Sequence, residues 1–474
     1  MPDRSCFFSA DRRTVSKSDL RNEALNLSSQ ETFSITSQFC RSMAAARFGD
    51  LPTKAVGEGK RGVLDWLGCV LAGSRHWTLD LLLQVLREAG GRPQATVFGR
   101  GRKLGFLDAP IANGQAGHVL DYDDTHMGGT LLHASSPVLP ALFALAERSE
   151  ASGAEFVLAY AVGFEAGVRV GRSAPGHHKG GWHLTGTLGC IAAGVAAGKL
   201  LKLDEERLVH AMAIAATQSA GMQQNRGTMC KSLHAGKAAS SGVLAALLAE
   251  RGFDGSREII EGKRGYCRIY SDVAMPEELT RDLGASWAIE RNGHKPYACG
   301  VVQHPVIDAV LAIRAKASVD PTRVETMEVR VHPLVVSVTG TEKPETGLQS
   351  KFSIYHSAAV ALIDGAAGIA QYTDERAADP AVAALRGKVK VTVDDALGTD
   401  QAEAVITSGG ERHRAFIEHA SGTADNPMSD AALEEKFLAN AAPVIGRERA
   451  ERARDLVWRL DKIGDVKELI ELCA

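Results

Sequence analysis

The sequence predicts a mostly α-helical protein with a smaller α+β domain: a helical bundle domain and a helix-covered, mainly antiparallel sheet domain. Three observations predict this class. Apolar residues recur at helical spacing from about residue 54 to residue 250, β-branched residues alternate with polar ones after residue 279, and helical spacing returns after residue 429. With 474 residues, 45% of them hydrophobic, the chain is too long for one core and apolar enough to fill several.

These changes of pattern divide the chain. We expect a mobile extension over residues 1–35, an all-helical domain over residues 36–278 and a smaller α/β lid domain over residues 279–428. The C-terminal helices of residues 429–474 should join the helical domain. The first segment is polar, mixed in charge and without a sustained period, and it has too many acidic residues for a mitochondrial transit peptide.

The helical domain should begin with an amphipathic helix that ends at Gly73. Residues 95–99 are short and β-prone, which indicates a connecting strand. Residues 190–201 are almost all small and apolar, and because small residues let helices approach closely, we place this helix at the centre of the bundle. The expected helices are Lys54–Ala72, Asp80–Glu88, one near Ala109, Pro140–Glu147, Gly153–Val170, Cys190–Leu201, Arg207–Gln218 and Lys231–Glu250.

The second half predicts half-buried strands separated by helices. Valine alternates with charged or polar residues at residues 327–331 and 389–393, and alanine and isoleucine do so at residues 402–406. Helices are expected over Val302–Ala315 and Ser353–Gly368. The stretch between Val335 and Ser350 fits no regular element and is a candidate lid or edge of an active site.

Composition excludes several classes of function. The net charge of −3, from 54 basic and 57 acidic residues, offers no electrostatic footprint for nucleic acid or an anionic membrane. The eight cysteines are scattered without a C-x-x-C pair, which favours free thiols in the cytoplasm and argues against zinc or an iron–sulfur cluster. No run approaches the roughly 18 apolar residues that span a bilayer. We therefore expect no metal, no cofactor and no membrane partner.

Acidic and imidazole side chains crowd residues 113–126 and 132–137, between two apolar periodic runs. Carboxylates cost several kcal/mol to desolvate unless they are paired, so this density at the edge of a core indicates a built site. Asp121 and His133 are the strongest candidates. For Asp123 and Asp124, a solvated helix end explains the residues equally well.

Two further segments supply candidates. The glycine-rich loop over residues 173–183 ends at His183, which is placed to point inward, whereas His177 and His178 are expected at the surface and Thr185 or Thr187 should cap the next helix. Lys231 and His234 lie three residues apart on one helix and share a face.

Taken together, these motifs resemble the MmgE/PrpD family over residues 36 to 470. The family includes 2-methylcitrate dehydratases, cis-aconitate decarboxylases and iminodisuccinate epimerases. The motifs that carry the resemblance are Asp65–Gly73, Leu120–Thr125, Gly181–Gly189, Lys231–Ala239, Lys295–Gly300 and His304–Ala309.

The resemblance implies a homodimer of two-domain subunits with a metal-free site between the domains. By motif position it implies a catalytic pocket and a neighbouring segment from the second domain. The catalytic positions are Asp121, Thr125, His133, His183 and Lys231. The residues expected to bind substrate or shape the pocket are His234, Tyr297, Cys299 and His304.

The family's reactions build negative charge on a carbon next to a carboxylate, which fixed positive charge stabilises. We assign His133 as base, His183 as acid, Lys231 as carboxylate clamp and Asp121 as the group that orients a histidine; the two histidines are interchangeable at this stage. Nothing near a cysteine supports a thiolate nucleophile.

Two departures from the family pattern bear on the substrate. His133-Ala134-Ser135 stands where methylcitrate dehydratases carry His-Pro-Ser, and it looks closer to the decarboxylase and epimerase branches. Residues 335–339 lack the tyrosine that animal cis-aconitate decarboxylases carry there, which argues against formation of itaconate.

We expect a cytoplasmic, cofactor-independent dehydratase that acts on a small di- or tricarboxylate such as 2-methylcitrate. The alternatives are an epimerase of an iminodisuccinate-like dicarboxylate, a cis-aconitate-type decarboxylase and, outside enzymes, a silent polycarboxylate-binding homologue.

Overall fold

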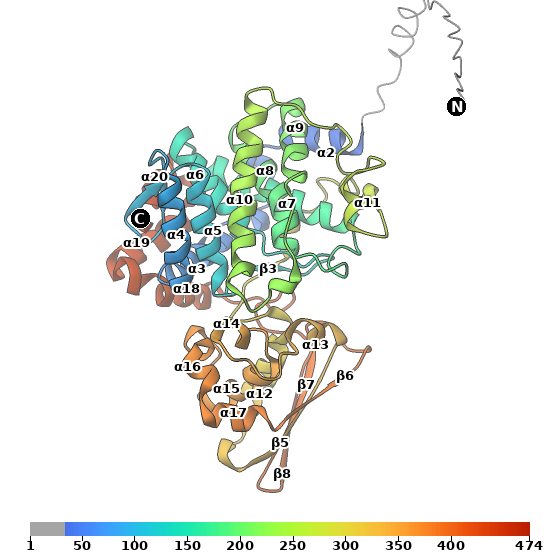
Figure 1. The fold of residues 1–474 in the computed structure, drawn as a ribbon, viewed down its shortest axis with the longest axis vertical. Coiled ribbons are helices and arrows are strands. Elements are labelled where there is room, and N and C mark those ends of the chain that lie inside the picture. The colour runs from blue at the N-terminus through green and yellow to red at the C-terminus, as the bar shows by residue number, and fades with distance from the viewer. Residues whose placement is uncertain (1–33) are drawn as a thin grey trace, which may run out of the picture. The chain divides into compact units, whose positions relative to one another are not determined.

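The computed structural model describes residues 34–474, of which Ile35–Ala474 form one unit with two hydrophobic cores. The predicted N-terminal extension lies almost entirely outside the described residues. The predicted class, mostly helical with a smaller α+β part, is confirmed (Figure 1). Among residues 34–474, no helix is both long and apolar enough to cross a membrane.

The larger core is built from helices of the first half of the chain. Most predicted helices are present, with ends shifted by a few residues. The elements are α2 (Ile35–Ala45), α3 (Thr53–Gly73), α4 (Trp77–Ala89), β1 (Ala95–Val97), β2 (Arg102–Leu104), α5 (Asp108–Val119), β3 (Thr125–His126), α6 (Ser135–Ser149), α7 (Gly153–Ser173), α8 (Leu184–Leu200), α9 (Glu205–Ala216), α10 (Met229–Glu250), α11 (Tyr266–Tyr270) and β4 (Asn292–Gly293).

Helix α8 lies at the centre of this bundle, as predicted, and packs against α6, α7, α9 and α10. The small residues of α8 are required because the neighbouring helices lie very close to it. A Cβ atom added to Gly163 of α7 would lie 2.5 Å from the Cβ of Ala196, so a larger residue would push the two helices apart. The close packing holds α5, α8 and α10 rigidly around one end of the bundle, where the candidate residues lie.

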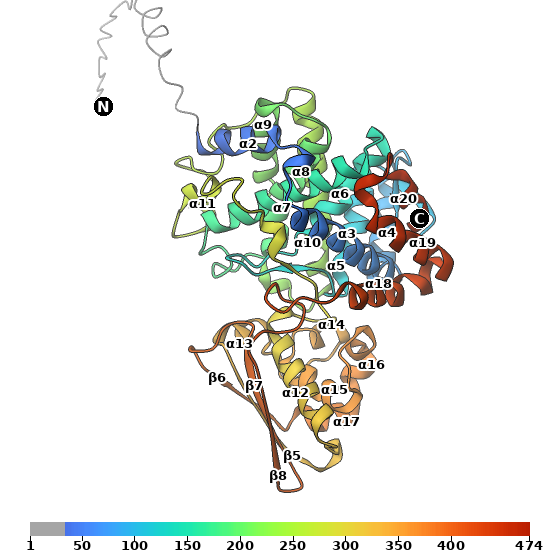
Figure 2. The same cartoon turned by 180° about the vertical axis from the view of Figure 1, so that it is seen from behind.

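The smaller core belongs to a four-stranded sheet in the order β6-β5-β7-β8. Helices α12, α15 and α17 cover one face of this sheet (Figures 1 and 2). The elements are α12 (His304–Lys316), β5 (Val324–Val331), α13 (Pro333–Thr339), α14 (Gly347–Ser350), α15 (Ile354–Asp364), α16 (Asp374–Ala378), α17 (Pro380–Arg386), β6 (Val389–Val393), β7 (Ala402–Ser408) and β8 (Glu411–Ile417).

The sheet is mainly antiparallel, as predicted, with one parallel pair. Val329 of β5 lies opposite Val391 of β6 in the parallel pair and opposite Ala404 of β7 in an antiparallel pair. Strand β6 is parallel because helices α13 to α17 carry the chain back across the sheet between β5 and β6. The stretch between Val335 and Ser350, which fitted no element in the sequence, contains the short helices α13 and α14.

The C-terminal helices α18 (Asp430–Ile445), α19 (Arg447–Trp458) and α20 (Lys467–Cys473) return to the larger core, and α18 packs along α3. The contact is close: a Cβ atom on Gly68 of α3 would lie 3.2 Å from the Cα atom of Phe437. One face of α18 is therefore fixed beside the segment that follows α5. The domain limits given above stay a prediction.

Candidate active site

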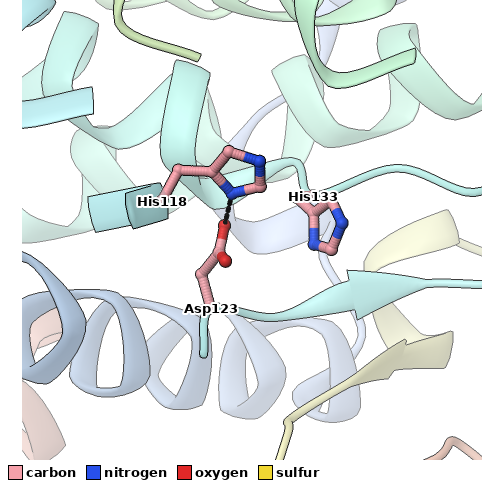
Figure 3. Close-up of side chains that lie close together, drawn as sticks. All are labelled: His118, Asp123 and His133. Carbon is pink, nitrogen blue, oxygen red and sulfur yellow. Dashed lines mark hydrogen bonds and ion pairs between the residues drawn. The ribbon is translucent and has the colours of Figure 1, made fainter. Parts of the chain in front are cut away.

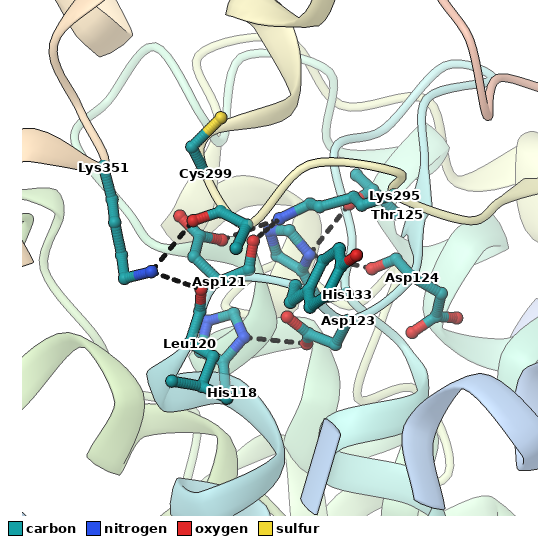
Figure 4. A network of polar contacts seen from close by, with 12 residues as sticks. His118, Leu120, Asp121, Asp123, Asp124, Thr125, His133, Lys295, Cys299 and Lys351 are labelled. Carbon is teal, nitrogen blue, oxygen red and sulfur yellow. Dashed lines mark hydrogen bonds and ion pairs between the residues drawn. The ribbon is translucent and has the colours of Figure 1, made fainter. Parts of the chain in front are cut away.

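Asp121 is the acidic centre of the site. It follows α5 in a turn and has a φ of +51°, a left-handed conformation that is uncommon for a non-glycine residue. Its Oδ1 atom accepts hydrogen bonds from Lys295 Nζ at 2.7 Å and from Lys231 Nζ at 3.2 Å (Figure 4 shows the Lys295 contact). Burial raises the pKa of Asp121, but these two lysines outweigh burial and hold the pKa well below its usual range.

Three lysines from separate parts of the chain meet here. Lys231 comes from α10, Lys295 from the segment after β4 and Lys351 from the residue after α14, and they are 8%, 2% and 3% exposed. Lys351 Nζ donates to the carbonyl oxygens of Leu120 and Ala298 at 2.8 and 2.9 Å. Lys295 and Lys351 were not singled out from the sequence.

The three lysines differ in pKa. Burial lowers the pKa of Lys351 to about 8 and also lowers that of Lys231, although Asp121 opposes it in both cases. For Lys295, Asp121 and Asp123 outweigh burial, so its pKa is raised. Lys231 and Lys295 both bind the carboxylate of Asp121, but the contact of Lys231 is longer. The carboxylate therefore compensates the charge of Lys231 less than that of Lys295.

Four imidazole rings line the other side of the site. The ring of His118 lies 4.8 Å from that of His133 and is stacked 5.6 Å from that of His183, between centroids. His183 Nδ1 lies 3.0 Å from His234 Nδ1, so one of these nitrogens donates to the other. Burial lowers the pKa of all four rings, to about 4 for His234, and nearby lysines lower it further. The four rings are neutral at pH 7.

His118 and Asp123 form a buried pair that the sequence did not single out (Figure 3). Asp123 Oδ2 lies 2.8 Å from His118 Nδ1 and accepts from Ser136 Oγ at 2.7 Å. Burial raises the pKa of Asp123, but His118 outweighs it and the pKa is lowered. A carboxylate only accepts, so Nδ1 of His118 carries the hydrogen. Its Nε2 atom is buried and has no partner among the described residues.

The prediction that Asp121 orients a histidine is wrong, because Asp121 binds two lysines and Asp123 holds the histidine. The explanation of Asp123 and Asp124 as a solvated helix end is also wrong, since both side chains are fully buried. Asp124 Oδ2 accepts from Ser135 Oγ and Asn292 Nδ2, both at 2.7 Å. Burial, with the charge of Asp123, raises the pKa of Asp124 to about 7.

The ring of His133 is held by contacts to a backbone carbonyl group and to a threonine hydroxyl. Its Nδ1 atom lies 2.9 Å from the carbonyl oxygen of Asp124 and 2.9 Å from Thr125 Oγ1. Since a carbonyl oxygen only accepts, Nδ1 of His133 carries the hydrogen and Nε2 keeps its lone pair. Thr125 is fixed in turn because β3 pairs with β4. The geometry thus brings six predicted residues into one cluster, of which four are buried and two, His183 and His234, are half-buried. The buried four are Asp121, Thr125, His133 and Lys231.

The candidates from the second core, Tyr297, Cys299 and His304, mainly contact one another and Asp308. Tyr297 OH donates to Asp308 Oδ1 at 2.5 Å, and the Tyr297 ring packs 5.2 Å from the His304 ring. His304 Nε2 lies 3.3 Å from the carbonyl oxygen of Cys299. Burial lowers the pKa of His304 to about 3 and raises that of the Cys299 thiol to about 11. Substrate contact by these residues stays a prediction.

Two predictions about the loop before α8 are wrong. His177 is only 1% exposed and its Nε2 atom lies 3.0 Å from Thr187 Oγ1. Thr185 Oγ1 accepts from the backbone N–H of His133 at 3.4 Å. Neither threonine caps α8, which begins after His183 without a side-chain cap. Both hydroxyls instead connect the helix to its neighbours.

His118, Asp123 and His133 are the one group among residues 34–474 with the composition of a metal site, and their ligand atoms lie within 4.8 Å of one another. Metal sites usually combine at least three ligands with a geometry that points all of them at one ion. Here His118 and Asp123 are bonded to each other, and lysine ammonium groups lie close by. We assign no metal to this group.

Comparison with known proteins gives a coherent result. The model of the MmgE/PrpD N-terminal domain matches residues 37–279, and that of the MmgE/PrpD C-terminal domain matches residues 297–462. The chain is 27% identical over 471 residues to a cis-aconitate decarboxylase of Aspergillus terreus (92% of this chain and 95% of that protein). It is 27% identical over 459 residues to the cis-aconitate decarboxylase of Mus musculus, covering 93% of each protein. A cis-aconitate decarboxylase-like protein oryM of Aspergillus oryzae is 28% identical over 471 residues (93% and 97%).

Proposed function

The chain belongs to the MmgE/PrpD family, and we propose that it is a lyase that releases CO2 from an unsaturated tricarboxylate such as cis-aconitate by acid–base chemistry of its own side chains. One observation carries the proposal: Lys231 and Lys295 bind the carboxylate of Asp121 and Lys351 binds the carbonyl group just before it, beside four neutral imidazole rings. Full-length relatives that are cis-aconitate decarboxylases support the choice of substrate.

The charge of the cluster favours a polyanion. Asp121 compensates Lys295 well and Lys231 less well, and Lys351 bonds only to carbonyl oxygens. A substrate carboxylate that approaches Lys231 therefore gains a strong interaction in a site that excludes water. Lys231 acts as the clamp for one substrate carboxylate, and Lys351 offers a charge to a second.

The reaction breaks the bond between a carboxylate and its carbon. The electron pair that remains is delocalised through the neighbouring carbon–carbon double bond into a second carboxylate, and the carbanion then accepts one proton. Lysine ammonium groups stabilise the charge that develops on that carboxylate, and such preorganised groups typically contribute several kcal/mol. CO2 leaves as a neutral molecule, so the step needs no external oxidant or reductant.

The proton comes from a histidine. In the free protein burial and the lysines hold the pKa of His183 and His133 well below 6.5. A bound polyanion opposes the effect of the lysines, so an imidazole takes up a proton when substrate binds. We assign His183 as this acid. Residues 335–339 contain no tyrosine, so the proposed reaction uses no tyrosine from that segment.

A second candidate is dehydration of a hydroxy acid such as 2-methylcitrate. One specific observation favours it: the bond from His133 Nδ1 to the carbonyl oxygen of Asp124 leaves the Nε2 lone pair free to remove a proton from carbon. His183 would then protonate the leaving hydroxyl group.

We also infer that the chain acts as a homodimer in the cytoplasm. Sedimentation of the purified protein would test the dimer.

The experiment is ¹H NMR of the chelator-treated protein in deuterated water with cis-aconitate, citrate, 2-methylcitrate or iminodisuccinate. We expect cis-aconitate to lose CO2 and gain one deuterium. Lys231→Met and His183→Gln should remove the reaction, and Lys237→Met, an exposed residue on the same helix, should not. Loss of water from 2-methylcitrate alone would replace the first candidate by the second. If none of the four acids reacts, the proposal is wrong.

A further inference from the structure

Lys436 lies on α18, more than 300 residues from Asp121 in the sequence, yet its ammonium group reaches the active-site backbone. Its Nζ atom donates to the carbonyl oxygens of Tyr122 and Lys295 at 2.7 and 2.8 Å and lies 2.5 Å from Asp65 Oδ1. It also lies 3.9 Å from the centre of the Tyr122 ring. The side chain is 3% exposed, two of its N–H donors bond to these carbonyl groups, and Asp65 compensates its charge.

The two carbonyl groups belong to the segments that supply the ion pair of the active site. Tyr122 directly follows Asp121, and Lys295 is the partner of Asp121 itself, at 2.7 Å. The Tyr122 hydroxyl donates to the carbonyl oxygen of Pro296 at 3.2 Å. The two segments are thus joined by the ion pair of their side chains and, through Lys436, by their backbones.

Asp121 needs such support. Its φ of +51° is costly for a residue with a side chain and persists only where the surrounding structure holds it. The bond from Lys436 to Tyr122 lies at the next carbonyl group along the chain. Lys351 and Lys295 hold the carbonyl groups of Leu120 and Asp121, and Lys436 holds the next one. Its loss removes the last of these three supports and lets the turn shift the Asp121 carboxylate relative to the lysines.

Lys436 is not a further substrate ligand. Burial lowers its pKa, but Asp65 outweighs burial and the pKa is raised, so the charge is permanent and already compensated. Asp65 also lies 3.4 Å from His294, the residue before Lys295. The pair of Asp65 and Lys436 therefore anchors the Lys295 segment from two sides, and Asp65 already compensates the charge of Lys436.

We propose that Lys436 is a positioning residue: by bonding the carbonyl groups of Tyr122 and Lys295 it sets the distance between Asp121 and Lys295, and it makes the C-terminal helix α18 part of the active site. The activity test of this inference rests on the proposed function, but its structural test does not.

The variant is Asp65→Asn/Lys436→Met, which removes both buried charges together and leaves no uncompensated ion. The matched control is Lys60→Met/Asp461→Asn, which removes another ion pair between α3 and the C-terminal part of the chain, with Nζ and Oδ1 2.5 Å apart and no contact to the site. We expect kcat of the first variant to fall about 100-fold, as for an active-site shift of the order of 1 Å. KM should change no more than in the control, and kcat is compared at a temperature at which circular dichroism shows both variants to be folded.

Two results would overturn the inference. One is a kcat within threefold of the control. The other, independent of any turnover, is a crystal structure of the variant in which Lys295 Nζ and Asp121 Oδ1 remain 2.7 Å apart. If the wild-type protein converts no acid, the proposed function fails and the crystal structure alone decides the inference.

Asp65→Asn/Lys436→Gln provides the second variant, because the amide restores two N–H donors without a charge. It should recover at least tenfold of the lost kcat. Equal kcat values in the two folded variants would contradict positioning by hydrogen bonds. If the Asp65→Asn/Lys436→Met variant does not fold, kcat and the distance from Lys295 to Asp121 are measured on Asp65→Asn/Lys436→Gln instead. We then expect kcat to fall about tenfold.

Discussion

Two ionic networks lie next to each other in this protein, and they differ in charge balance. One is balanced: three acids and three cations pair with one another between α3, α18 and the segment before Lys295. Its members are Glu58, Asp65, Asp430, Arg61, His294 and Lys436. The other is the active-site cluster, in which three lysines face the two ionised carboxylates of Asp121 and Asp123, so one cation is in excess. A matched network holds the fold together, whereas an unmatched one is prepared for an anion.

The pKa values of the histidines differ between the two networks in the same way. In the balanced network the acids Asp65 and Glu58 outweigh burial and raise the pKa of His294 to about 9. In the active-site cluster burial and the lysines lower the pKa of His133 and His183 well below 6.5. Residues of one type are thus charged in one network and neutral in the other, and only the neutral ones offer a lone pair to a substrate.

The largest expected effect is on turnover. Lys231→Met removes the least compensated ammonium group of the active-site cluster and leaves the ion pair of Asp121 and Lys295 intact. We expect kcat to fall by about 10²–10³, as for loss of one preorganised charge, with little change in stability. Steady-state kinetics beside Lys237→Met, an exposed lysine on α10, measures the effect. An equal loss in both variants would show that the cluster has no special role.

The next effect concerns stability and belongs to the balanced network. His294 has a folded-state pKa raised to about 9, so its stabilisation is complete below pH 6.5 and is lost as the pH rises through 9. The loss amounts to roughly 3 kcal/mol of unfolding free energy. The difference between the wild type and His294→Gln in urea unfolding at pH 6.5 and 9.5 measures it, because Lys351 titrates in the same range in both proteins, with the opposite sign. If both proteins respond alike, His294 is not the group that titrates.

A smaller loss of stability should follow Arg61→Met. Arg61 pairs with Glu58 at 2.9 Å, donates to the carbonyl oxygen of Met428 at 2.7 Å and contacts Asp430, and its side chain is 11% exposed. We expect the unfolding free energy to fall by about 1–3 kcal/mol. The kcat of the folded protein should stay within twofold of the wild type. A large fall in kcat without a change in the urea midpoint would place Arg61 in the active-site cluster.

The smallest expected effect is the pH dependence of kcat/KM on the acid side. Because the pKa values of His133 and His183 lie well below 6.5 and that of His234 is lowered to about 4, these three rings remain mainly neutral in the free protein as the pH falls below 6.5. After correction for ionisation of the substrate, kcat/KM should change less than about twofold between pH 7.5 and 5.5. Above pH 8, where Lys351 loses its charge, kcat/KM should fall. The Lys351→Met variant should not show this fall. A fall through pH 6.5 would indicate an unshifted histidine or a role for Asp124, whose pKa is raised to about 7.

Much of the fold follows from periodicity, since apolar spacing predicts α3 up to its last residue, Gly73, and alternating valines predict β5 and β6. Strand β8 was missed because its exposed residues show no apolar alternation. Gly409-Gly410, both with positive φ, is the hairpin signal that would have located it. The parallel pairing of β5 and β6 depends on the path of the intervening helices, which local pattern does not specify.

The active site was only partly predictable. Acids and imidazoles next to apolar runs indicate Asp121 and His133, but the local sequence does not say which of three neighbouring aspartates binds lysines and which binds His118. Lys351 and Lys436 come from ordinary surroundings in the sequence. Their roles depend on packing between segments more than 200 residues apart, which periodicity does not report.

The most direct test of the difference between the two networks is calorimetric binding of unreactive acids: propane-1,2,3-tricarboxylate, glutarate and acetate. We expect affinity to increase with the number of carboxylates, Lys231→Met to weaken tricarboxylate binding at least tenfold, and Arg61→Met to leave it unchanged. Binding of the tricarboxylate should also take up a proton, seen as a heat that depends on the buffer. If affinity does not depend on the number of carboxylates, or if both variants weaken it equally, the active-site cluster is not a site for polycarboxylates.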